Sequence, residues 1–164
     1  MTHSALALFC LALATVIPTN SVVAHESKAA TLMTASLPLA ARPAAAAVDR
    51  FHAALRRGDT RAAAALLSAD ALIFESGGVE RSKAEYASHH LAADAAFAAA
   101  TSQKTTRQSG SAIGDVAWIA TEGTTTGKYK DRLIDSVSTE TMVLRRTNGA
   151  WKIVHIHWSS AKTK

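Results

Sequence analysis

Histidine is the residue type whose placement in this 164-residue sequence most directly suggests chemistry. His52 and His90 fall on segments with helical apolar spacing, whereas His155 and His157 share one face of a predicted strand, because side chains alternate along a strand. A neutral imidazole can hold a metal ion or transfer a proton near neutral pH. We expect His52 and His90 either to line a pocket or to be core residues whose nitrogens find partners.

A metal site at His155 and His157 is an alternative. Two imidazoles at i and i+2 can reach one ion, and His89 or His90 with Glu75 could complete the ligand set. A His-x-His pair on a strand is more commonly hydrogen-bonded across the sheet or placed at a dimer interface. We therefore expect no metal and no other cofactor.

The first 24 residues are predicted to be an export signal. The run from Ala5 to Ile17 is apolar apart from Thr15, and it is too short to span a bilayer. Cleavage after Ala24 fits the small residues that a signal peptidase accepts. Because the segment lacks Lys and Arg, a buried helix is the alternative. Once this signal is removed, we expect the protein to be periplasmic or secreted and not to bind a membrane.

Composition excludes several classes of function. The only cysteine, Cys10, lies in the predicted signal, so the mature chain has no disulfide, thiolate nucleophile or cysteine zinc site. The net charge is +5, but Lys and Arg are dispersed and are not interleaved with aromatic residues. Nucleic-acid binding is therefore not expected. The length leaves room for one domain.

Helical patterns dominate the first half of the mature chain. Residues 25–43 are rich in Ala, Ser and Thr and predict a flexible spacer. Apolar residues then recur at helical spacing over 44–57. Asp59 or Thr60 can cap a second short helix that ends near Ser68.

A small hairpin and a third helix follow. Residues 71–75 form a β-prone run, Ser-Gly-Gly makes a turn, and residues 79–80 return as a short strand. The spacing of Ser82 and Glu85 is typical of a capping box and predicts a helix to about Ala99. The face of this helix that should pack on a sheet comprises Tyr86, His90, Ala93 and Phe97.

The remaining chain reads as an antiparallel four-stranded meander. Turn signals at Gly114-Asp115 and Asn148-Gly149 separate the first two strands from each other and the last two from each other. Helices first and strands last predict an α+β fold with segregated layers. The expected strands cover 104–113, 116–126, 133–146 and 151–160, before a tail at 161–164.

The last strand has an apolar face that should point inward. We assign this face to Val154, Ile156 and Trp158, which places His155 and His157 on the opposite face of the sheet. A shift of one residue would reverse the two faces.

The order of elements and three sequence stretches resemble the NTF2-like superfamily. The stretches are Arg50–Leu55 with Gly58-Asp59, then Ala69-Asp70-Ala71, and Trp151–His157. Within that superfamily the chain most resembles the SnoaL-like and DUF4440 groups over residues 44–160. Its last strand is similar to the association domain of calcium/calmodulin-dependent kinase II. The resemblance implies a cone: a curved sheet wrapped around the first helix, a pocket at its open end, and a homodimer formed through the convex face.

The resemblance also implies a candidate general base. The ketosteroid-isomerase branch places its base five residues after the Asp of Ala-Asp-Ala, which is Glu75 here. That branch also uses a phenol on the first helix and an acid on the third meander strand. The phenol position falls on Phe51 and the acid near Met142 and Val143, so both partners are expected to be missing.

The kinase-hub branch lines its pocket with arginines, and the matching positions here are Gly123, Met142 and Trp158. These residues predict a mainly apolar pocket for an apolar or aromatic small molecule. The candidate ligand contacts are Phe51, Tyr86, Trp118, Met142 and Trp158.

Three functions stay open. The favoured hypothesis is an exported, dimeric protein that binds a small molecule. The second is a cofactor-independent lyase, isomerase or cyclase with Glu75 as base and His52 or His90 as proton partner. The third is an assembly module that uses its convex sheet, including His155 and His157.

Overall fold

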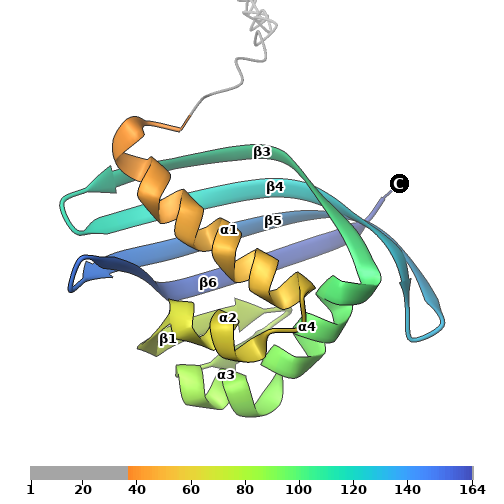
Figure 1. Cartoon of the computed structure of the whole chain (residues 1–164). Helices are drawn as coiled ribbons and strands as arrows, with labels where there is room; N and C mark the ends of the chain where they lie inside the picture. Colours follow the sequence, from red (N-terminus) through yellow and green to blue (C-terminus); the bar gives the residue numbers. More distant parts are fainter. Residues whose placement is uncertain (1–36, 164) are drawn as a thin grey trace, which may run out of the picture. The chain divides into compact units, whose positions relative to one another are not determined.

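The computed structural model describes residues 37–163, and the predicted signal lies outside the described residues. Within these residues, five helical segments and six strands follow one another along the chain in alternating groups. Figure 1 shows their arrangement. The helical segments are the 3₁₀ turn η1 (Leu39–Ala41), α1 (Arg42–Arg56), α2 (Thr60–Leu66), α3 (Lys83–His89) and α4 (Leu91–Ala100). The strands are β1 (Leu67–Glu75), β2 (Gly78–Glu80), β3 (Thr101–Ile113), β4 (Val116–Tyr129), β5 (Arg132–Thr147) and β6 (Ala150–Lys162).

Helical structure begins earlier than the sequence predicts. The expected spacer ends at residue 43, but η1 and the first turn of α1 already occupy 39–43. Pro43 lies in the first turn of α1, where the missing N–H would have no partner within the helix. Ala41 is buried and Leu37 packs against the core. At the other end, β6 takes in part of the expected tail.

Local capping determines where the short elements begin. The Asp59 carboxylate accepts from the Ala62 N–H and caps α2, as expected. The Ser82 hydroxyl accepts from the Glu85 N–H, while the Glu85 carboxylate accepts from the N–H of Arg81. The capping box is therefore present, with its return bond displaced by one residue.

The predicted third helix is two helices. It breaks at His90, which ends α3 and begins α4 with φ −106° and ψ −28°. The break rotates the second half, so the residues of α4 that pack inward are Leu91, Ala95 and Ala98. His90 and Ala93 are exposed, and their assignment to the packed face is wrong.

A single six-stranded sheet forms the second layer, and its strand order is β2-β1-β6-β5-β4-β3. The meander β3 to β6 is antiparallel throughout, as predicted. The pairing of β1 with β6 is parallel, and the sequence did not predict it. Figure 1 shows α1 lying across strands β3 to β6, with α4 at one end. The α+β prediction is confirmed.

A bulge decides which side chains of β6 point inward. The pairing of β5 with β6 shifts between Val143 and Leu144, which leaves Val154 as the extra residue. Ile153 and Ile156 are therefore both fully buried, and the inward assignment is correct for Ile156 but wrong for Val154.

The core lies between α1 and the inner face of the sheet. Its largest fully buried side chains come from α1, α3 and strands β1, β4, β5 and β6: Tyr86, Phe51, Ile73, Ile119, Met142, Leu144, Ile153, Ile156 and Val48. Within residues 37–163, no helix is long and apolar enough to cross a membrane.

Candidate functional site

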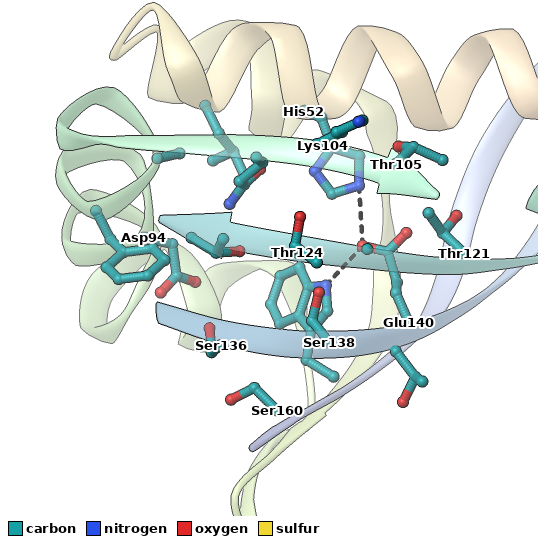
Figure 2. Close-up of a pocket in the computed structure, with 18 of the residues that line it drawn as sticks. His52, Asp94, Lys104, Thr105, Thr121, Thr124, Ser136, Ser138, Glu140 and Ser160 are labelled. Carbon is teal, nitrogen blue, oxygen red and sulfur yellow. Dashed lines mark hydrogen bonds and ion pairs between the residues drawn. The ribbon is translucent and has the colours of Figure 1, made fainter. Parts of the chain in front are cut away.

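A cavity of about 490 Å³ opens beyond the core, between the C-terminal half of α1, helix α4 and the inner face of the sheet (Figure 2). Strands β3, β4 and β5 supply most of its wall. Its volume is within the range of small-molecule sites.

Polar and apolar atoms share the cavity surface about equally, so the pocket is not mainly apolar as the sequence predicts. Met142 is fully buried beneath the cavity and does not line it. Beyond Met142 the inner faces of β4 and β5 carry small hydroxyl residues, which the sequence argument did not weigh. Among the lining residues are Thr121, Thr124, Thr125, Ser136, Ser138, Thr139, Ser159 and Ser160.

A buried carboxylate lies within this wall. Glu140 on β5 is only 8% exposed. Its Oε2 atom accepts a hydrogen bond of 2.6 Å from the indole Nε1 of Trp158 and lies 2.9 Å from Nε2 of His52. Figure 2 shows both contacts converging on one oxygen of Glu140. Three elements, α1, β5 and β6, thus contribute to this cluster.

The other oxygen of Glu140 has no partner. Oε1 of Glu140 and the hydroxyl oxygen of Thr121 are both covered from solvent, and neither is hydrogen-bonded within residues 37–163. Thr121 and Glu140 occupy paired register positions on β4 and β5, so the two atoms belong to one part of the wall. A buried acceptor without a donor costs about 1–3 kcal/mol, and more when it is charged.

Glu140 was not among the residues predicted from the sequence. The acid position of the third meander strand was expected near Met142 and Val143, where the sequence has no acid. An acid does lie on the inner face of that strand, two residues before Met142. The alternation of β5 puts Glu140 on the same face as Met142 and Leu144. The sequence pattern that could have identified Glu140 is a charged residue on a strand face whose other residues are apolar and buried.

A second acidic group lies at the rim. Glu75 and Asp94 both line the cavity. Partial burial, followed by repulsion from Asp94, raises the pKa of Glu75. Burial also raises the pKa of Asp94, partly offset by the 2.7 Å hydrogen bond that the Tyr86 hydroxyl donates to it. The pKa of Tyr86 is raised by burial and by Asp94, which keeps the phenol protonated as a donor.

The candidate catalytic residues separate in the structure. Glu75 and His52 line the same cavity, whereas His90 does not. The His90 side chain is 61% exposed and pairs with buried Glu80. The hydrogen bond to Glu80, together with its charge, raises the pKa of His90. Its influence on Glu75 is electrostatic, since the cation favours the ionised carboxylate.

The candidate ligand contacts also separate. Trp158 lines the cavity, stacked 6.4 Å from Phe51 and equally close to Tyr86. Phe51 and Tyr86 are fully buried and support Trp158 from below. Trp118 is 45% exposed and pairs with Val143 on the outer face, so its placement in the pocket is wrong.

The outer face holds His155 and His157, on the side that the sequence analysis assigned to them. Nδ1 of His155 lies 2.9 Å from the Leu72 carbonyl, and both imidazoles contact the ring of Phe74 edge-on. Across residues 37–163, no group of three or more His, Cys, Asp or Glu side chains is arranged to hold a metal ion.

Helices packed on a curved sheet, with a cavity beyond the core, define a protein with the NTF2-like fold. Residues 44–163 match the family model of the SnoaL-like domain. The chain belongs to this family, as its sequence predicts. A comparison with curated proteins finds no match.

Solved structures agree with this assignment. A proposed ketosteroid isomerase from Shewanella frigidimarina is 39% identical, with a TM-score of 0.68, and the alignment covers 71% of this chain and 94% of that one. A proposed calcium/calmodulin-dependent kinase II association domain from Xanthomonas campestris is 24% identical, with a TM-score of 0.66 and coverages of 77% and 93%. A proposed NTF2-like dehydratase from Streptomyces avermitilis is 21% identical, with a TM-score of 0.64 and coverages of 74% and 96%. The last two show the fold alone.

Proposed function

We propose that this protein binds a polar small molecule in the cavity. The observation that carries the proposal is the cavity of about 490 Å³, whose wall contains the buried Glu140 carboxylate among hydroxyl side chains. Buried polar groups that converge on a cavity are typical of ligand sites, where they orient the bound molecule. Export, predicted from residues 1–24, is part of the proposal and places this activity outside the cytoplasm.

Filling the cavity tests the proposal. Ser138→Trp places an indole in the cavity, whereas Leu39→Trp adds the same indole at an exposed position on η1, outside the cavity. Native mass spectrometry of gently purified protein is expected to detect a retained small molecule in the wild type and in Leu39→Trp, and none in Ser138→Trp. Equal retention by the two variants, or no retained mass in the wild type, would contradict the proposal.

A second candidate function is proton transfer on the bound molecule without a cofactor. Glu75 supports it, because a carboxylate with a raised pKa at a cavity is suited to accept a proton from carbon. The 39% identity to a proposed ketosteroid isomerase favours the same chemistry. This candidate adds catalysis to the binding function and uses the same cavity.

We also propose a homodimer formed through the outer face of the sheet. Strand alternation places five exposed apolar residues on this face: Ile113, Val116, Trp118, Leu133 and Val137. Ile113, Val116 and Trp118 are neighbours on this face, and a cluster of exposed apolar side chains supports a protein interface there.

Trp118→Glu is expected to weaken this dimer at least about tenfold, because it buries a charge in the interface. Sedimentation velocity over a concentration series measures the effect. Leu39→Glu is the control, since Leu39 is 75% exposed but lies on η1, away from the sheet. A monomeric wild type, or equal weakening by both variants, would exclude this interface.

A further inference from the structure

The deep end of the cavity presents two hydrogen-bonding atoms that the protein leaves unused. Oε1 of Glu140 and the hydroxyl oxygen of Thr121 lie on paired positions of adjacent strands, covered and unpartnered within the described chain. Glu140 is more than nine-tenths buried and lines the cavity. Such an arrangement is complete only when another molecule brings a donor.

The donors of Trp158 and His52 that lie closest to Glu140 are directed at its other oxygen. An indole has one N–H, and that of Trp158 points at Oε2 of Glu140. The closest nitrogen of His52, Nε2, faces the same oxygen. Neither Trp158 nor His52 therefore serves Oε1, and the Thr121 hydroxyl is not hydrogen-bonded to it, so both atoms remain available to a bound group.

The charge of the wall disfavours an anion at this point. Carboxylates outnumber permanently cationic side chains among the lining residues, although the whole chain is basic. The carboxylates are Asp49, Glu75, Asp94 and Glu140, and the cations are Arg56 and Lys104. A neutral or positively charged donor fits this field better than a carboxylate or phosphate does.

We infer that the ligand carries a hydroxyl or a protonated amine that docks between Glu140 and Thr121. The inference rests on the proposed function and names the chemistry of its ligand. A hydroxyl donates to Oε1 of Glu140 and accepts from the Thr121 hydroxyl, whereas an ammonium donates to both oxygens. Because both atoms are covered, docking includes a small side-chain movement, which is common on binding.

Three probes with one shared body test the inference: 2-phenylethanol, 2-phenylethylamine and 2-phenylethyl methyl ether. Isothermal titration calorimetry with the wild-type protein is expected to show the alcohol and the amine binding at least about tenfold more tightly than the ether, which has no donor. The ratio of the affinities for the alcohol and the amine shows whether the neutral or the charged donor is preferred. Only the affinity for the amine should fall as the salt concentration rises.

Two variants locate the effect. Glu140→Gln keeps an acceptor for Trp158 but replaces the other oxygen with a donor. The affinity for the amine is therefore expected to fall more than about tenfold. The alcohol should then bind no more tightly than the ether. Thr121→Val keeps the shape and should weaken the alcohol about threefold or more without affecting the ether. Glu122→Gln, on the exposed side of β4, makes the same charge change as a control.

The outcomes separate the two proposals. Equal binding of all three probes to the wild type, or an unchanged order in Glu140→Gln and Thr121→Val, would overturn the donor inference and leave the ligand-binding function standing. Absence of binding by every probe would count against both. If Glu140→Gln does not fold, Thr121→Val alone still decides the inference.

Discussion

Replacing Glu75 with glutamine is expected to slow the conversion of 3-cyclohexenone to 2-cyclohexenone at least about 100-fold, if the cavity catalyses proton transfer. In this reaction a proton leaves the carbon between the carbonyl and the double bond and returns at the far end of the double bond. The Glu75 carboxylate carries the proton between the two carbons. Glutamine has the same size but cannot accept it. The absorbance of the conjugated product measures the rate.

Glu122→Gln is the matched control for this substitution. Glu122 is exposed and pairs with Arg107, outside the cavity. It should retain the wild-type rate. An unchanged rate in Glu75→Gln would exclude Glu75 as the base, and an inactive wild type would exclude proton transfer on this class of substrate.

The rate of this reaction is also expected to depend on pH in a defined direction. The base must be ionised, so the rate rises as the pH increases through the pKa of Glu75. Burial and Asp94 raise that pKa, which places the midpoint above the ordinary value for glutamate of about 4.3. Asp94→Asn removes the repulsion, keeps an acceptor for Tyr86, and should move the midpoint of kcat/KM to lower pH.

Truncating Phe51 to alanine is expected to lower the free energy of unfolding by about 3–5 kcal/mol. Phe51 is fully buried on α1 and stacks 6.4 Å from Trp158, so its loss leaves a hole where α1 meets the sheet. A typical domain has only about 5–15 kcal/mol of stability, so this loss is large. Urea denaturation measures it.

Phe97→Ala is the same chemical change at a half-buried position. The Phe97 ring packs edge-on against Tyr129 at 5.4 Å and lines the cavity. Phe97→Ala should lower the free energy of unfolding by only about 1–2 kcal/mol, because the substitution removes less buried apolar area than Phe51→Ala does. Equal losses for the two variants would show that the contact between α1 and β6 is not a principal source of stability.

Most elements of this fold were predictable from the sequence because near neighbours determine them. The α2 cap at Asp59, the turn at Asn148-Gly149 and the alternation of β5 each depend on a few adjacent residues. The break at His90 was not predictable in this way. The surrounding residues favour helix, and only the packing of α3 and α4 against different neighbours shows the change of direction.

The candidate site was predicted in part. The sequence placed Glu75, His52 and Trp158 among the functional residues, and the structure brings all three to one cavity. It also placed Trp118 there and omitted Glu140. Trp118 was misplaced because its side chain was assigned to the inner face of the sheet, whereas it lies on the outer side of β4. Glu140 was omitted because the acid was expected two residues further along β5.

The sequence by itself determined the family, the order of helices and strands, and the antiparallel meander, since these follow from periodicity, caps and turn residues. The tertiary structure decided the parallel pairing of β1 with β6, the bulge at Val154, and the cavity wall around Glu140. Strand register and the approach of α1 to the sheet bring distant residues together. Which side chains share a cavity depends on that long-range packing, which no local pattern encodes.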